Sequence, residues 1–312
     1  MAFTVVPLHN LKLPPGTSIP FADVFVLRDI PDWLRKDQQI LNSLSRHERE
    51  SVLQAHHALV AEYPASAIGE PDPDWRGKDR KSIQETKFES AILANLAMWL
   101  RQPSSVCFTV GFDALCWPDP DRSEPLPIAQ QIQRQDPLHC HPNDVGNIVE
   151  PTHLTKSAEI YTALLSVPRG NPVWEALRAV WAALASYSAD RRYPFFWIGL
   201  EALFGASNPN EISYKLCQRI AFFLAKTPED ARSLFKRARN CYNTRSKIIH
   251  GRWEHDPAID LVMADTEAIV RTALRHLLDD PRMLQTFISK RRDEFLEDWV
   301  FSRSTDPPPY PV

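Results

Sequence analysis

Arg245 and His250 are the two residues of this chain whose types and spacing best fit a chemical reaction. They lie at 242–251, in the segment Tyr-Asn-Thr-Arg-Ser-Lys-Ile-Ile-His-Gly. A guanidinium carries a permanent positive charge that suits the anionic oxygens of a phosphodiester. An imidazole has an ordinary pKa of about 6.5, so it exchanges a proton near neutral pH. The two groups therefore predict chemistry on a phosphodiester.

Arg245 stands where the surrounding pattern predicts an apolar side chain. Apolar residues recur every three or four positions on one helical face, at Ala231, Leu234, Phe235, Ala238, Cys241, Tyr242, Ile248 and Ile249. A guanidinium on such a face needs a carboxylate, backbone acceptors or an opening to a ligand. Glu201, which interrupts a nearly all-apolar helix at 195–204, is the predicted partner. The pair has two compatible roles, which are to orient two helices and to present the guanidinium to a phosphate.

The helix that carries both residues has clear limits in the sequence. Thr227 supplies an N-cap hydroxyl, Pro228 suits the first helical position, and Gly251 suits the end. On an ideal helix, residues five apart are separated by about 140°. Arg245 and His250 therefore share a face only if the helix end unwinds or a cleft wraps around it.

Helical periodicity dominates from about residue 151 to 301, which predicts a mainly α protein. The candidate helices are Val173–Tyr187, Tyr193–Phe204, Asn210–Ala225, Pro228–His250, Pro257–Leu278 and Pro281–Val300. We expect a helical domain at 166–303, a smaller mixed α/β region at 1–165 that senses or regulates, and a loose Pro-rich tail at 304–312.

The first region mixes extended and helical patterns. Its first 30 residues are expected to be extended, and Phe21–Leu27 favours a strand. One or two helices are expected in Asp32–Glu62 and another in Ser82–Leu100. Ser105–Phe112 favours a strand. The segment rich in Pro, Asp and Gln from Trp117 to Pro151 predicts an irregular connection.

Positive charge is concentrated around the candidate residues. The chain has a net charge of −3, but 190–256 holds twelve basic and seven acidic residues, which is a local net charge of +5. Such a region fits a polyanion partner, although a solvated helix face has the same composition. The residues predicted to contact this polyanion, which the resemblance described below implies to be RNA, are Lys247, Arg252, Tyr242, Arg191 and Arg192.

Composition argues against several other classes of protein. Glycine is scarce, at 9 residues, and neither a Walker A loop nor a GxGxxG motif occurs. The five cysteines are odd in number and scattered, which favours a reducing cytoplasm over a disulfide framework. No apolar run approaches the roughly 20 residues of a membrane helix. No cofactor is predicted.

Two rival sites remain open. Arg49 and His56 could share a helical face, but they lack a nearby buried acid and the concentrated positive charge. A metal site built on His139, Cys140, His141 and Cys116 would lack the usual spacing of zinc ligands.

The order of these elements resembles the HEPN superfamily, and most closely the ApeA-like HEPN domain of prokaryotic defence proteins. The resemblance rests on the aromatic-Trp-Ile-x-Leu-Glu-x-Leu-Phe-Gly segment at 195–205, the helix around 213–224, and the segment at 242–251. It covers about 173–300.

The resemblance implies a helical up-and-down domain that forms a homodimer and acts as a metal-independent endoribonuclease. Arg245 and His250 match the family's Arg-x4-6-His motif, Asn243 matches its flanking polar residue, and Glu201 matches the acid of the preceding helix. Many members carry Asn, Asp or His directly after the arginine, where this chain has Ser246. The resemblance also implies phage defence or a toxin-like system, with an antitoxin or a trigger protein as partner.

The expected reaction is attack of an RNA 2′-hydroxyl on the adjacent phosphorus. His250 would transfer protons and Arg245 would stabilise the charge on the non-bridging oxygens. One histidine is short of the two proton-transfer groups usually needed, so we expect two protomers to pool their motifs. The alternative is a non-catalytic HEPN module that binds RNA, a nucleotide or a partner protein, with a structural Arg245.

Overall fold

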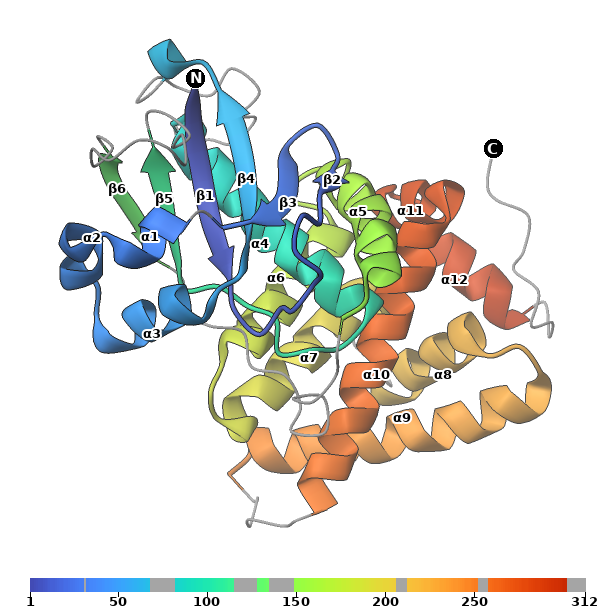
Figure 1. Cartoon of the computed structure of the whole chain (residues 1–312). Coiled ribbons are helices and arrows are strands. Elements are labelled where there is room, and N and C mark those ends of the chain that lie inside the picture. Colours follow the sequence, from blue (N-terminus) through green and yellow to red (C-terminus); the bar gives the residue numbers. More distant parts are fainter. Residues whose placement is uncertain are drawn as a thin grey trace. The chain divides into compact units, whose positions relative to one another are not determined.

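The fold is mainly α with a small N-terminal antiparallel sheet, as seen in a computed structural model of the chain (Figure 1). The structure describes residues 1–30, 32–67, 82–114, 128–134, 149–205, 212–251 and 258–301. The chain divides into two compact units, Met1–Leu165 and Ser166–Val312. Within the described residues, no helix is both long enough and apolar enough to cross a lipid bilayer.

The N-terminal unit is built on six antiparallel strands in the order β2-β3-β4-β1-β5-β6. The strands are β1 (Ala2–Leu8), β2 (Ile19–Phe21), β3 (Phe25–Asp29), β4 (His57–Tyr63), β5 (Val110–Ala114) and β6 (Ile128–Arg134). The helices are α1 (Asp32–Lys36), α2 (Gln38–Ser43), α3 (Arg46–Gln54), the 3-10 turn η1 (Ala65–Ala67), α4 (Ile83–Arg101) and α5 (Pro151–Leu165).

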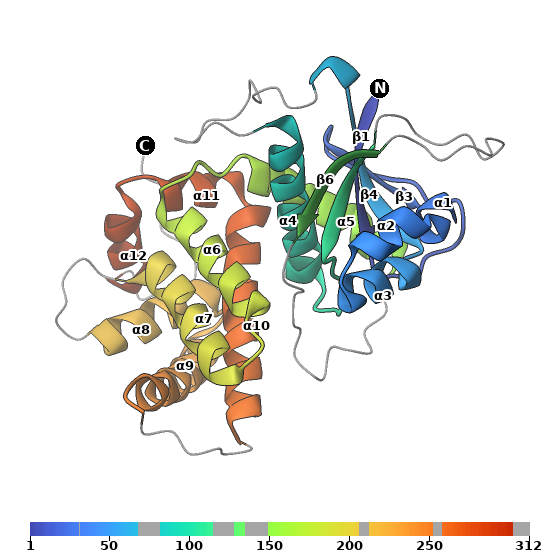
Figure 2. The same cartoon turned by 90° about the vertical axis from the view of Figure 1, so that its left-hand side faces the viewer.

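Helices cover both faces of this sheet (Figure 2). Phe3 and Val5 of β1 belong to the apolar cluster that α1, α2 and α3 complete on one face. The neighbouring Val6 points to the other face, toward α4, because side chains alternate along a strand. There Gly111 leaves room for Phe88 of α4, whose ring would lie 2.7 Å from any added Cβ atom. The all-buried pattern of β1 follows from this double cover.

Two sequence predictions for this unit were wrong. Residues 57–62, assigned to a helix, form most of β4, which pairs with β1 and β3 in the middle of the sheet. Residues 128–134, assigned to an irregular connection, form β6 at the edge next to β5. Strand pairing with distant segments decides both cases, and local composition does not carry that information.

Asp113 of β5 is a buried carboxyl whose protonation bears on the stability of this unit. Asp113 is 1% exposed. Its Oδ1 atom accepts hydrogen bonds from Thr4 Oγ1 at 2.7 Å and from the Tyr63 hydroxyl at 3.3 Å. Burial raises the pKa of Asp113 to about 6, against the lowering effect of the two hydrogen bonds. The folded unit therefore holds this proton at pH values where the unfolded chain releases it.

We expect the unfolding free energy of the wild type to fall as pH rises from about 4 to about 7. A carboxyl with a raised folded-state pKa stabilises the fold below the unfolded pKa and loses that contribution through the folded pKa. A difference of about two pKa units corresponds to roughly 3 kcal/mol. Urea unfolding across this pH range should show that the unfolding free energy of the wild type falls as pH rises. The control Asp23→Asn, which changes an exposed carboxyl, should show the same fall, and Asp113→Asn should show a smaller one. Equal slopes for Asp113→Asn and the wild type would contradict the prediction.

The C-terminal unit consists of seven helices among the described residues (Figures 1 and 2). They are α6 (Pro172–Ala185), α7 (Ala189–Phe204), α8 (Ile212–Leu224), α9 (Pro228–Ile249), α10 (Ala258–Asp279), α11 (Pro281–Ile288) and α12 (Arg292–Phe301). The helices predicted at 173–278 are confirmed. The single helix predicted at 281–300 is two, because α11 ends at the cap residue Ser289.

Large aromatic side chains form the core of this unit. Tyr193, Phe196, Trp197 and Phe204 of α7 are fully buried, and Phe204 meets Phe287 of α11 edge to face. The burial of these rings explains most of the apolar sequence of α7, although Ile198 of the same helix is 45% exposed. An acidic residue on such a helix must find a partner on a neighbouring helix.

Candidate active site

Helix α9 begins and ends where its sequence predicts. The Thr227 hydroxyl accepts a hydrogen bond from the Asp230 backbone N–H at 3.1 Å, and Pro228 holds the first helical position. His250 is the C-cap residue, and Gly251 follows with a φ of 65°, a conformation that favours glycine. These caps place Arg245 inside the helix and His250 at its end.

A buried hydrogen bond joins α7 to α9. The Tyr193 hydroxyl donates to the Cys241 carbonyl at 2.7 Å and lies 3.2 Å from Thr266 Oγ1 of α10. Cys241 is one turn before Arg245, and Tyr193 is about two turns before Glu201. This contact joins α7 and α9 one helical turn from Arg245 on α9 and about two turns from Glu201 on α7.

Glu201 and Arg245 form the predicted ion pair. Arg245 Nη2 lies 3.1 Å from Glu201 Oε1 and 3.4 Å from Oε2. The two side chains are 22% and 29% exposed, for Arg245 and Glu201 respectively, so the pair is neither sealed in the core nor fully solvated. Within the described part of the chain, Nη1 makes no hydrogen bond or ion pair. Among the described residues, the guanidinium is thus held by its Nη2 atom, and its Nη1 atom has no partner.

Burial makes ionised Glu201 costly. Desolvation raises the pKa of the Glu201 carboxyl, and the nearby Arg245 charge lowers it. The arginine therefore keeps this carboxylate ionised more readily than its surroundings alone would allow. The charged form of Glu201 therefore depends in part on Arg245.

Tyr242 packs within the site. Its ring lies edge-on to Trp197 at 5.1 Å between centroids, and Arg245 Cζ lies 5.5 Å from its centroid. A cation at this distance from an aromatic ring is attracted to it. Tyr242, predicted to contact RNA, thus has a second role as the surface on which the guanidinium rests. The buried Trp197 is a contributor that the sequence analysis missed, and its place four residues before Glu201 was the available signal.

His250 is exposed and does not touch the Glu201–Arg245 pair. Its backbone N–H donates to the Ser246 carbonyl at 3.1 Å, so helical hydrogen bonding continues to this residue. The angle of about 140° between Arg245 and His250 therefore persists. Among the described residues, no hydrogen bond or ion pair joins the His250 side chain to Arg245 or Glu201. One chain brings the cation and the acid together but leaves the imidazole on another face.

The other predicted residues differ in accessibility. Asn243 and Lys247 of α9 are exposed, and Ser246 is half-buried. Arg191 is exposed in the first turn of α7. Its neighbour Arg192 is only 5% exposed, so the predicted RNA contact does not fit its position in this structure. The neighbouring side of α7 is buried in the core, and sequence charge alone did not reveal that. Arg252 lies outside the described residues.

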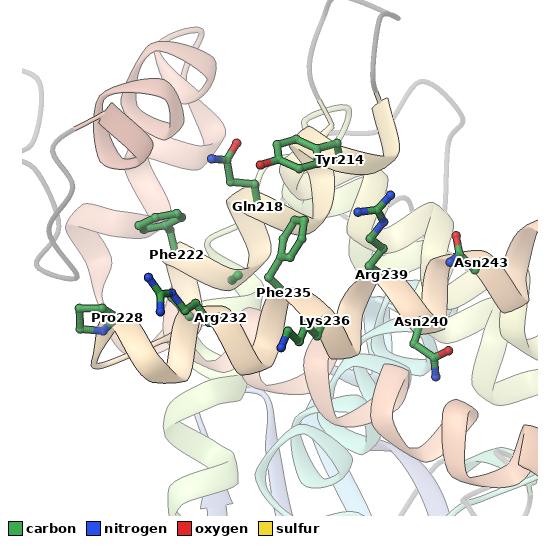
Figure 3. A pocket seen from close by; sticks show the side chains of 12 residues that line it. Tyr214, Gln218, Phe222, Pro228, Arg232, Phe235, Lys236, Arg239, Asn240 and Asn243 are labelled. Carbon is green, nitrogen blue, oxygen red and sulfur yellow. The ribbon is translucent and has the colours of Figure 1, made fainter.

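A groove between α8 and α9 is a feature that the sequence analysis did not predict (Figure 3). Its volume is about 670 Å³. This α8–α9 groove is defined by its lining residues Tyr214, Gln218 and Phe222 of α8 and Phe235, Arg239 and Asn243 of α9. The repeat of three or four residues on both helices was a signal in the sequence, but only their packing side by side creates the groove.

The structure describes Arg49 of the first rival site, whereas the residues of the second lie outside the described part of the chain. Arg49 of α3 donates from Nε to the Leu41 carbonyl at 2.9 Å, which ties α3 to α2. Among the described residues, no group of three or more His, Cys, Asp or Glu side chains is placed to hold a metal ion. The metal site considered at His139, Cys140, His141 and Cys116 lies outside those residues.

Comparison with protein-family models, with curated proteins and with solved structures finds no match for this chain in any of the three. The likeness to the HEPN superfamily accordingly remains an expectation from the sequence segments quoted above.

Proposed function

We propose that this protein is a HEPN-type, metal-independent endoribonuclease in which two protomers combine Arg245 and His250 at one RNA phosphate. One observation carries the proposal. The Arg245 guanidinium is oriented by Glu201 through Nη2 alone, and it remains partly open to solvent on the helix that ends in an exposed histidine. Cleavage of a phosphodiester is accelerated by a fixed cation and by groups that transfer protons.

In the proposed reaction, the His250 imidazole takes the proton of the RNA 2′-hydroxyl. The 2′-oxygen then attacks phosphorus, and the bond from phosphorus to the 5′-oxygen breaks. His250 of a second protomer protonates the leaving 5′-oxygen. The products are a 2′,3′-cyclic phosphate and a 5′-hydroxyl. Arg245 binds the non-bridging oxygens as their negative charge grows.

The separation of Arg245 and His250 on one chain supports a composite site. An angle of about 140° keeps the two side chains from converging on one phosphate within a protomer. A two-fold axis would bring one copy of each motif beside the other copy. The same arrangement supplies the second histidine that the reaction requires.

The proposed setting is phage defence or a toxin-like system in prokaryotes, inside the cytoplasm. The N-terminal unit, with its separate sheet and core, would then recognise a trigger or restrain the nuclease. An antitoxin or a trigger protein is the proposed partner.

Cleavage of single-stranded RNA is expected to continue in excess EDTA and to be absent with DNA of the same sequence. The reason is that the 2′-hydroxyl is the nucleophile and the charge is stabilised by a side chain. Denaturing gels and mass analysis of the fragment ends would detect the 2′,3′-cyclic phosphate. Loss of activity in EDTA, or equal cleavage of the DNA, would rule out this mechanism.

A non-catalytic binding module is the second candidate, and one observation favours it. The Glu201–Arg245 pair already explains why an arginine lies on the packed side of α9, without any reaction. In that case Arg245→Ala would unfold the C-terminal unit, and His250→Ala would change nothing measurable. No RNA would be cleaved by the wild type.

A further inference from the structure

Three cations line the α8–α9 groove, namely Arg232, Lys236 and Arg239 of α9. Among the lining residues that the structure describes, none is Asp or Glu. Within the described residues none of the three makes an ion pair, whereas Arg237, on another face of the same helix, lies 3.3 Å from Asp265. Cations that stay unpaired along one face are placed for an anionic partner.

Aromatic rings and amides line the space between these cations. Tyr214 is 47% exposed, and its ring meets Phe235 at 5.2 Å between centroids, at an angle of 68°. Gln218 and Asn243 present amide groups at the same groove (Figure 3). Exposed aromatic rings stack on nucleobases, and amides form hydrogen bonds with their edges. Rings, amides and unpaired cations in one groove are typical of surfaces that bind single-stranded nucleic acid.

The residues of α9 that line the groove lie on the same helical face as His250, and Arg245 lies on a different face. Seven residues span about 700° of a helix, within about 20° of two full turns. Arg232 and Arg239 therefore lie on one face of α9, and so do Asn243 and His250. The backbone hydrogen bond from His250 to Ser246 keeps the helix regular to that point. A strand lying in the groove would reach His250 about 10 Å beyond Asn243.

We infer that the α8–α9 groove binds single-stranded RNA and directs it along α9 to His250. Tyr214 is a stacking platform, and Arg232, Lys236 and Arg239 contact phosphates. This assignment rests on the proposed nuclease function for its choice of RNA. A second copy of the chain is disfavoured as occupant because a two-fold axis through the groove would set these cations against each other. An acidic protein segment would satisfy the cations but would not use the exposed ring and amides.

The test measures binding apart from cleavage. Fluorescence anisotropy would use a labelled uridine RNA of about 16 nucleotides, the upper end of single-strand site sizes. The full chain would carry His250→Ala so that the RNA stays intact. In this background, Tyr214→Ala is expected to weaken binding by about 5- to 150-fold, and Tyr214→Phe to preserve it. Circular dichroism would show that each variant is folded.

Arg239→Gln and Arg237→Gln form a matched pair, because they remove the same charge from the same helix on different faces. Arg239→Gln is expected to weaken binding and to reduce the slope of log affinity against log salt by about 0.7, the value for one phosphate contact. Arg237→Gln is expected to leave the slope unchanged. Equal effects of the two changes, or full affinity in Tyr214→Ala, would overturn the inference. The inference would also be overturned if groove variants changed the sedimentation of the protein and left its RNA affinity unchanged, because the groove would then bind a second copy of the chain.

A separate cleavage assay with His250 intact distinguishes the two proposals. If groove variants lose RNA affinity while the wild type does not cleave, the groove assignment stands and the nuclease proposal fails. If the wild type cleaves RNA and the groove variants bind it normally, the nuclease stands and the groove assignment fails.

Discussion

Replacing His250 with alanine is expected to lower RNA cleavage by about 10²- to 10⁴-fold, the usual contribution of a general acid or base. The side chain is exposed at the end of α9, and the backbone hydrogen bond of His250 does not depend on it. The fold should therefore survive. Single-turnover cleavage rates, with thermal unfolding of the same samples, would measure both quantities.

His56→Ala is the matched control for this change. His56 is also exposed, lies in the N-terminal unit, and belongs to the rival pair with Arg49. Its loss should leave cleavage unchanged. The opposite pattern, with activity lost in His56→Ala and kept in His250→Ala, would transfer the site to the rival pair.

Subunit mixing extends the same experiment to the composite site. If two copies of His250 act on one phosphate, excess His250→Ala protein should suppress a fixed amount of wild type as mixed dimers form. A wild-type rate that stays constant during this titration would show that each protomer acts alone.

Replacing Arg245 with alanine is expected to lower cleavage by about 10²- to 10³-fold, the usual effect of losing one group that stabilises a developing anion. The same change leaves Glu201 without its cation. A charged group that loses its partner in a partly buried site costs about 1–3 kcal/mol of stability. Cleavage rates and urea unfolding would therefore both respond.

The stability loss should depend on pH in a defined direction. Desolvation already raises the pKa of Glu201, and without Arg245 the opposing effect is lost, so the pKa rises further. The folded variant then holds a proton that the unfolded chain releases. Its stability is fullest below the unfolded pKa of Glu201 and decreases as pH rises through the folded pKa. Urea unfolding at several pH values would measure this.

The double variant Arg245→Ala with Glu201→Gln separates structure from catalysis. The neutral amide removes the unpaired carboxylate, so stability and its extra pH dependence should recover. Cleavage should remain low, because no guanidinium faces the phosphate. Recovery of cleavage together with stability would mean that Arg245 acts only through the fold and takes no direct part in catalysis.

Local sequence determined where α9 begins and ends, and it indicated that Glu201 pairs with Arg245. Thr227, Pro228 and Gly251 act on residues within one turn, so their effect is visible without any tertiary contact. Arg245 on an apolar face and Glu201 on an apolar helix each demanded a charge partner, and the structure joins them at 3.1 Å.

Tertiary structure alone decided the rest. β4 and β6 depend on pairing with strands far away in the chain, and their sequences did not predict strands. Arg192 is buried because one side of α7 turns into the core, although its charge suggested exposure. The α8–α9 groove exists because two helices pack side by side and align Tyr214 with Phe235. Caps and spacing act within a few residues, whereas grooves and sheet order depend on which distant surfaces meet.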